Sequence, residues 1–290
     1  MDKSSILVQL DTDPHPSVFD RVVAVDAGVQ HIFSYGGVTP ENVKPLVQGC
    51  IFTRGHADLK RTAIFVGGSD LAAGEALFEA VQKLLIPEYK LTVSVMLDSN
   101  GANTTAAAAV RAAGRHLDLS KTKSLILGGT GPVGQRVARL LAKHGGHVRI
   151  GSRQKERAEA VCAGLRNIYP NAMLEAVATA SSADGPAALN GRELVVAAGA
   201  GGVVLLPKKH RDTCKTLQVM IDLNGEPPAG IEGVEPFDKG GTKDGVIAYG
   251  SAGVGGTKMR THRAAIAELF TRNDATFDID EIYDIAQKQA

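Results

Sequence analysis

The chain has 290 residues, of which 32 are Lys or Arg and 31 are Asp or Glu, so its formal net charge is +1. This balance argues against a dedicated nucleic-acid binder, which carries a basic excess, and an aromatic content of 4% is too low for base stacking. Glycine is in excess, with 33 residues where average usage gives roughly 20. The question is whether these glycines cluster at places where the backbone must approach a ligand closely.

The N-terminal segment and the cysteines predict the compartment. The first residues are acidic and lack the apolar run of a signal peptide, and no run approaches the roughly 18 apolar residues of a membrane span. Cys50, Cys162 and Cys214 are widely spaced and form no Cys-x-x-Cys pair, which disfavours a disulfide framework and a zinc site. We therefore expect a reduced, cytoplasmic protein without a metal or a membrane contact.

Short apolar runs alternate with amphipathic or Ala-rich segments, which predicts an α/β fold with a parallel sheet. In the first hundred residues the predicted strands are 6–10, 50–53, 63–66 and 93–97. Helices are predicted to begin near Ser17, Thr39 and Ser69, which are good N-cap residues, and an Ala-rich helix follows at 102–116.

A second series of strands and helices begins near residue 123. The predicted strands are 124–127, 148–150, 194–197, 219–223 and 246–249, and the predicted helices are 132–144, 154–168, 207–214, 258–270 and 278–289. The segment 224–245 is a long connection. We predict a Rossmann domain with a doubly wound parallel sheet at 101–272. A smaller α/β substrate domain at 1–100 is completed by the C-terminal helix 273–290, with a cleft between the two domains.

A glycine cluster follows the strand predicted at 124–127. Gly129, Gly131 and Gly134 form Gly-x-Gly-x-x-Gly between a strand and a helix, which is the setting of a dinucleotide fingerprint. The helix start offers free N–H groups to a pyrophosphate. We therefore expect the turn itself to contact the cofactor through Gly129, Thr130, Gly131, Pro132 and Val133.

The end of the next strand predicts which nicotinamide cofactor is used. An NAD site usually has a carboxylate about 20 residues after the glycines, but this chain has Ser152 and Arg153 there. A guanidinium suits a 2′-phosphate, so NADP is favoured and NAD stays possible. The alternative for Arg153 is an ordinary solvated residue at a helix start.

Further small residues follow other strands. Ala198, Gly199 and Ala200 follow the strand at 194–197, and Asn224 follows the strand at 219–223. The carboxyl ends of parallel strands line one crevice, so we expect these residues to contact the cofactor. Gly253, in a third cluster at 250–256, either shapes the nicotinamide side or belongs to a tight turn.

The sequence has no recognisable proton relay. None of the five tyrosines is followed four residues later by lysine, and the eight histidines are scattered. A substrate whose oxidised product is a stabilised cation can lose hydride without losing a proton. Such a site needs positioning more than a base.

Four segments together resemble the methylene-tetrahydromethanopterin dehydrogenases of one-carbon metabolism. The segments are 11–13 with 16–20, 51–55 with 62–68, 96–106, and 253–263, and with the glycine turn they span almost the whole chain. The resemblance implies hydride transfer from the methylene pterin to NADP or NAD, a pterin bound between a substrate domain and a Rossmann domain, and a homo-oligomer.

The resemblance also implies roles for four residues. Lys258 and Asp20 match positions in the family's cleft and are the catalytic candidates, with Lys258 orienting the pterin or tuning its nitrogen. Asp20, Asn100, Thr104 and Lys258 are the expected substrate contacts, although Asn100 and Thr104 would also suit helix capping. A methylene-tetrahydrofolate dehydrogenase, a shikimate-type dehydrogenase and a non-enzymatic NADP-binding sensor are the alternatives.

Overall fold

The computed structural model describes residues 3–180 and 184–289. The chain forms two compact units, Met1–Thr104 with Met259–Ala290, and Thr105–Lys258. The sequence suggested boundaries at 100/101 and 272/273, whereas the units divide within two helices, α4 (Ala102–Gly114) and α9 (Ser251–Glu268). The second half of α9 belongs to the first unit because its side chains, such as His262, pack there.

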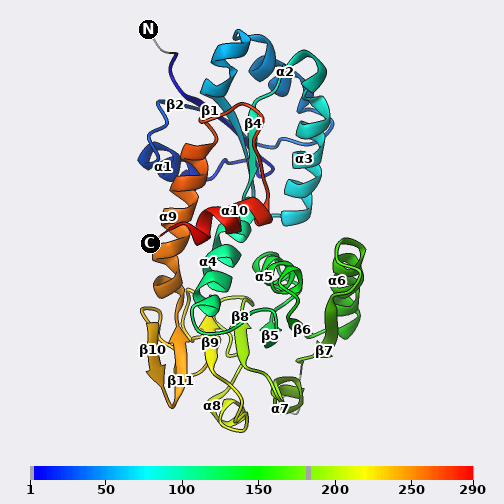
Figure 1. Cartoon of the computed structure of the whole chain (residues 1–290), viewed down its shortest axis with the longest axis vertical. Coiled ribbons are helices and arrows are strands. Elements are labelled where there is room, and N and C mark those ends of the chain that lie inside the picture. The colour runs from blue at the N-terminus through cyan, green and yellow to red at the C-terminus, as the bar shows by residue number, and fades with distance from the viewer. Residues whose placement is uncertain (1–2, 181–183, 290) are drawn as a thin grey trace. The chain divides into compact units, whose positions relative to one another are not determined.

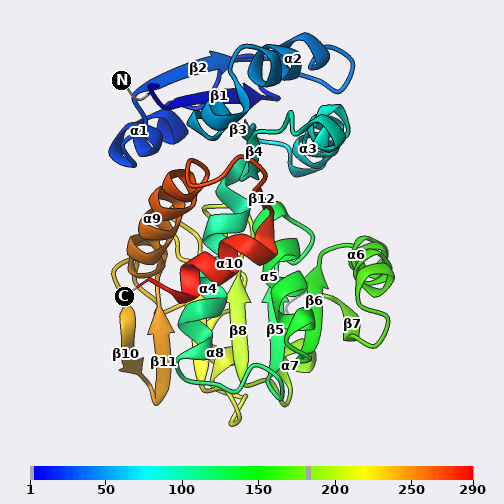
Figure 2. The same cartoon turned by 45° about the horizontal axis from the view of Figure 1, so that its top comes forward.

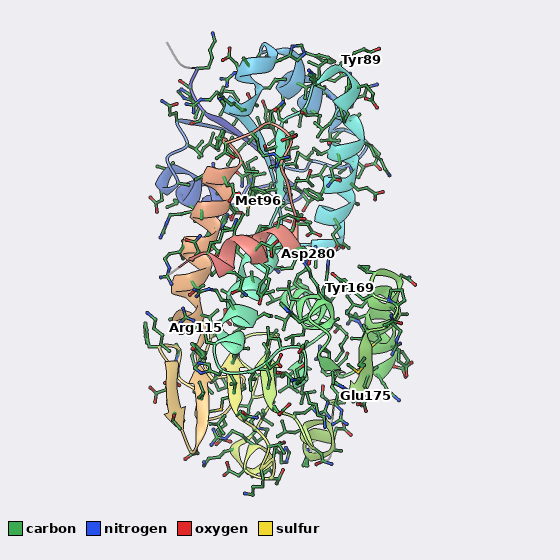
Figure 3. The ribbon with its side chains drawn as sticks, in the orientation of Figure 1. Tyr89, Met96, Arg115, Tyr169, Glu175 and Asp280 are labelled. Carbon is green, nitrogen blue, oxygen red and sulfur yellow. The ribbon has the colours of Figure 1, made fainter. Side chains whose placement is uncertain are left out.

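The first unit contains a five-stranded sheet of parallel strands in the order β12-β4-β3-β1-β2 (Figure 1 and Figure 2). The strands are β1 (Ile6–Asp11), β2 (His31–Tyr35), β3 (Thr62–Gly67), β4 (Ser94–Leu97) and β12 (Thr276–Phe277). β3 and β4 are buried along their whole lengths. Figure 3 shows Met96 of β4 inside this unit, whereas Tyr89, which is 71% exposed, lies at its outer surface.

The helices α1 (Val18–Asp26), α2 (Lys44–Phe52) and α3 (Leu71–Leu84) connect these strands, and α10 (Ile279–Gln287) follows β12. The strand predicted at 50–53 is wrong, because this segment ends α2, where Val47, Cys50 and Ile51 are buried at helical spacing. The helix predicted near Thr39 begins at Lys44, after a turn in which the Asn42 N–H donates to the Thr39 carbonyl. Strand β2 was missed because its residues alternate between exposed and half-buried.

The second unit contains a seven-stranded sheet in the order β10-β11-β9-β8-β5-β6-β7, in which β10 alone of these strands is antiparallel to its neighbour (Figure 2). The strands are β5 (Lys123–Leu127), β6 (His147–Ser152), β7 (Met173–Ala178), β8 (Leu194–Ala197), β9 (Val219–Asp222), β10 (Lys239–Lys243) and β11 (Val246–Tyr249). The α/β architecture is as predicted, and β5, which lies between β8 and β6, carries the glycine turn.

The helices of this unit are α5 (Pro132–Lys143), α6 (Lys155–Ile168), α7 (Asp184–Leu189) and α8 (Lys208–Arg211), together with most of α4 and the first half of α9. Several predictions need correction. The helix predicted at 207–214 spans only Lys208–Arg211, and no prediction covered β7 or α7. The connection 224–245 contains β10, and α9 begins at Ser251 rather than Lys258, so the third glycine cluster is largely helical. Glycines are poor helix formers, which hid this start from the sequence.

Candidate active site

The turn from β5 to α5 uses its glycines in two different ways. A methyl group at Gly134 would lie 2.5 Å from the Gly128 carbonyl oxygen, and one at Gly129 would lie 2.7 Å from a methyl carbon of Ile150. These two positions must therefore be glycine for the chain to pack. At Gly131 the nearest atom would be the Gly128 oxygen at 3.4 Å, an ordinary contact. The protein itself does not require glycine at 131, which is the expectation where a ligand approaches the backbone.

The start of α5 is suited to a phosphate. Within the described stretch 3–180, no side chain caps this helix, whose N-cap is Gly131 and whose first residue is Pro132. The N–H groups of its first turn therefore remain available to an anion. Thr130, Gly131, Pro132 and Val133 are half-buried and line this space, while the Thr130 carbonyl is fixed by the Gln135 amide at 2.9 Å. The turn thus fits the pyrophosphate of a dinucleotide.

The end of β6 lies directly beside this turn, because the Gly129 N–H donates to the Gly151 carbonyl at 2.9 Å. Ser152 is buried and its hydroxyl accepts the Gln154 N–H at 3.2 Å, so it shapes the bend that follows the strand. Arg153 is exposed. Of these two residues, Arg153 is the one whose side chain is open to a 2′-phosphate.

On the other side of β5, the turn meets the end of β8. A methyl group at Gly128 would lie 2.5 Å from Gly199 Cα, so the two glycine clusters are in backbone contact. Further along, a methyl group at Gly201 would lie 2.6 Å from a carboxylate oxygen of Glu226, in the loop after β9. The predicted residues Ala198, Gly199 and Ala200 therefore lie between the glycine turn and the β9 loop.

The β9 loop is held by two of its own polar side chains. The buried Asp222 carboxylate accepts the N–H groups of Asn224 and Ile231 at 3.0 and 2.9 Å. Burial raises the pKa of Asp222, and these backbone hydrogen bonds oppose the rise. The Asn224 amide donates to the Pro228 carbonyl and accepts the Glu226 N–H. Asn224 thus shapes the loop whether or not it also contacts a cofactor.

This loop encloses a pocket of about 210 Å³ at the carboxyl end of β9, lined also by Gly250 and Ser251 at the start of α9. The N–H groups in the first turn of α9 already have acceptors within the protein, because the Pro236 carbonyl accepts those of Ala252 and Gly253. A methyl group at Gly253 would collide with the Asp238 carbonyl. Packing therefore requires glycine at this position, which lies in the first turn of α9 rather than in a separate tight turn.

The first unit places a buried acid at the end of β4. The Asp98 carboxylate accepts both the N–H and the hydroxyl of Thr104, at 3.0 and 2.7 Å. Asn100, between them in the chain, is exposed and has a left-handed φ of 56°. Thr104 is fully buried, so its direct role in the structure is to fix the turn that presents Asn100.

Sequence reasoning missed the neighbours of Asp98. His262 of α9 is fully buried, and its Nδ1 lies 3.9 Å from an Asp98 carboxylate oxygen. Its ring stacks on Phe65 of β3, with centroids 5.7 Å apart, and lies 6.3 Å from the ring of Phe19. One sequence pattern could have pointed to His262: it follows Lys258 by four residues, a spacing that places both side chains on one face of a helix.

Asp20 and Lys258 belong to different units. Asp20 lies in the first turn of α1, where its N–H donates to the N-cap hydroxyl of Ser17 at 3.3 Å, and its side chain is half-buried. Lys258 is half-buried in the middle of α9 and ends the second unit.

Among residues 3–180 and 184–289, no three His, Cys, Asp or Glu side chains are grouped so that they could hold a metal ion. In the same part of the chain, none of the helices has the length and apolar character needed to cross a membrane.

Comparisons with known proteins agree with a dehydrogenase site. Residues 18–100 match the family model "Methylene-tetrahydromethanopterin dehydrogenase, N-terminal". The chain is 44% identical over 289 residues to the "Bifunctional protein MdtA" of Methylorubrum extorquens, covering 98% of this chain and 99% of that protein. It is 30% identical over 272 residues to the NAD(P)-dependent methylenetetrahydromethanopterin dehydrogenase of the same organism, covering 89% of each.

The fold is also similar to solved structures. Shikimate 5-dehydrogenase from Listeria monocytogenes, solved with shikimate and NAD, matches with a TM-score of 0.59 at 16% identity, over 97% of this chain and 96% of that one. At this identity the likeness concerns the fold alone.

Proposed function

The chain belongs to the methylene-tetrahydromethanopterin dehydrogenase family, and on that premise we propose that it oxidises 5,10-methylene-tetrahydromethanopterin to the methenyl form by direct hydride transfer to NADP, with NAD as a second acceptor. The observation that carries the proposal is the glycine turn, in which Gly131 leaves room for a pyrophosphate while Gly129 and Gly134 are required for packing. The reaction would serve one-carbon metabolism and formaldehyde oxidation in the cytoplasm, in a homo-oligomer.

The residues of this chain would act by binding and positioning. When bound, the nicotinamide cofactor supplies the hydride acceptor. The turn 129–133 would hold its pyrophosphate, Arg153 its 2′-phosphate, and residues 198–200 would pass beneath its ribose. Because the methenyl product is a cation shared between two nitrogens, the reaction needs no general base.

On the pterin side we propose Lys258 and Asp20 as the catalytic pair, with Asn100 as a further contact. Thr104 takes part through Asp98, whose carboxylate it fixes beside His262. The Asp98–His262 pair would hold the Asn100 turn against α9.

The test of the substrate is an assay at 340 nm with NADP and three substrates: methylene-tetrahydromethanopterin, methylene-tetrahydrofolate and shikimate. We expect reduction of NADP with the methanopterin substrate. Turnover of shikimate alone would make the chain a shikimate-type enzyme, and nucleotide binding without turnover of any of the three would make it a sensor.

Replacing Arg153 with Ala is expected to raise the KM for NADP by about one to two orders of magnitude, because a charge-assisted hydrogen bond contributes about 1.5–3 kcal/mol. The KM for NAD should change by less than about twofold. Steady-state kinetics with both cofactors measure this. Lys155→Ala is the matched control, since Lys155 is also basic and exposed but lies 3.7 Å from Glu159, its ion-pair partner. Equal effects of Arg153→Ala on both cofactors would refute the 2′-phosphate assignment.

Replacing Lys258 with Ala is expected to lower kcat by about tenfold or more while the dissociation constant of NADP stays unchanged, because an oriented cation near the reacting pterin is lost. Stopped-flow turnover and nucleotide titration separate the two quantities. Lys258→Arg keeps the charge and should retain more activity. Full turnover by the alanine variant would remove Lys258 from the site.

A further inference from the structure

The pocket at the end of β9 has an acidic wall. Of the described residues that line it, Asp222, Glu226 and Glu235 are carboxylates and none is basic. Asp222 is buried at the base of the loop, where backbone N–H groups bind it, whereas Glu226 and Glu235 are exposed, the Glu235 side chain to 78%. The two glutamates therefore carry the charge that an incoming ligand would meet.

Lys243 only partly offsets this charge. Lys243 Nζ lies 2.9 Å from an Asp238 carboxylate oxygen and 3.6 Å from a Glu235 carboxylate oxygen, so one ammonium is shared by two carboxylates. Glu226 instead lies against Gly201, in the loop that follows β8. Asp222, Glu226, Glu235 and Asp238, counted together with Lys243, keep a net negative charge.

The order of strands places this pocket at one end of the proposed cofactor. Across the sheet, β9 and β8 lie on one side of β5, and β6 lies on the other. Arg153 at the end of β6 would bind the adenosine half, so the nicotinamide half must extend toward β8 and β9. Close approaches follow this path: the Gly128 backbone lies against the Gly199 backbone, and the Gly201 backbone lies against the Glu226 side chain. The acidic pocket is therefore at the nicotinamide end.

We propose that Glu226 and Glu235 make this site bind the oxidised nicotinamide ring, which is cationic, in preference to the neutral reduced ring. The inference rests on the proposed function. When hydride leaves the methylene carbon with its two electrons, the positive charge moves from the nicotinamide to the pterin. The attraction to the glutamates is then lost, so the two carboxylates favour loading of NADP⁺ and release of NADPH.

The experiment is a binding titration that needs no pterin. NADP⁺, NADPH and adenosine 2′,5′-bisphosphate are titrated into the wild-type chain, Glu226→Gln, Glu235→Gln and the double variant, with calorimetry for all ligands and nicotinamide fluorescence for NADPH. Glu159→Gln is the control. This carboxylate is also exposed, but it lies on α6, which connects β6 to β7 on the opposite side of β5 from β8 and β9.

We expect the dissociation constant of NADP⁺ to rise about threefold in each single variant and about tenfold in the double variant, since exposed carboxylates contribute below about 1 kcal/mol each. The dissociation constants of NADPH and of the bisphosphate should change by less than about twofold in these variants. In the wild-type chain, the preference for NADP⁺ over NADPH should weaken as the salt concentration rises. An unchanged ratio, or equal weakening of both nicotinamide forms, would overturn the proposal.

The same titration keeps this proposal separate from the proposed function. If the wild-type chain prefers NADP⁺ as described but oxidises no reduced pterin, the substrate assignment fails and the charge preference stands. If the wild-type chain binds neither nucleotide, the cofactor assignment fails and this inference fails with it.

Discussion

Gly131→Ala is expected to keep the stability of the wild-type chain and to lose most of its affinity for NADP, whereas Gly134→Ala is expected to lose stability. At Gly131 the backbone has φ −78° and ψ 168°, which alanine adopts freely, and the new methyl group meets only ordinary contacts. The free energy of unfolding should stay level or rise by up to about 1 kcal/mol, because alanine restricts the unfolded chain. The methyl group would instead occupy the space of the pyrophosphate, which should weaken NADP binding by about 1–3 kcal/mol.

At Gly134 the opposing atoms are the Gly128 carbonyl oxygen and Gly129 Cα, which are backbone atoms and cannot rotate away. We expect a loss of about 1–3 kcal/mol in the free energy of unfolding, with weaker binding as a consequence. Urea denaturation and calorimetric titration of NADP measure the two effects on both variants. Wild-type affinity in Gly131→Ala would show that the cofactor does not approach this backbone.

Asp98→Ala is expected to lower the free energy of unfolding by about 3–5 kcal/mol. The substitution removes the acceptor for two hydrogen bonds from the buried Thr104 and the carboxylate beside His262. Buried donors that lose a charged acceptor are costly, because water cannot replace it. Asp98→Asn keeps one acceptor oxygen and should cost about 1–2 kcal/mol.

Asp70 in the same unit provides the control. It is exposed and accepts the Ala73 N–H at 2.9 Å as the N-cap of α3, so Asp70→Ala should cost only about 1 kcal/mol. Urea denaturation followed by circular dichroism compares the three variants. If Asp98→Ala costs no more than Asp70→Ala, the Asp98 cluster does not stabilise the first unit in the way its geometry indicates.

The central part of the second unit was predictable because its signals are local. The strand 194–197 and the helix predicted at 132–144 agree closely with β8 and α5, since a buried strand and a strongly amphipathic helix each have a clear period. The glycine turn was likewise evident, because strand, turn and helix are adjacent in the chain.

Other features depend on contacts between distant segments. β10 pairs with β11 although glycine and lysine dominate its sequence, and α9 begins in a glycine cluster because the loop at 235–238 supplies its cap. His262 could not be distinguished from the other histidines, because its partners Phe65 and Asp98 come from β3 and from the end of β4. Only the folded chain brings them together.

The capped start of α9 has a consequence for the direction of the cofactor. Two glycine-rich segments of the second unit lead into helices, and each would by composition serve as a phosphate cradle. At α9, the carbonyls of Pro236 and Asp238 accept the N–H groups of Ala252, Gly253 and Gly250, which neutralises the positive end of that helix. At α5 the Gly131 N–H donates to the Gly128 carbonyl within the turn itself, but in the described stretch 3–180 no carbonyl of another loop accepts the N–H groups of Val133 or Gly134. We therefore expect a dinucleotide to place its pyrophosphate at α5 and not at α9, which would fix the direction in which it lies across the sheet.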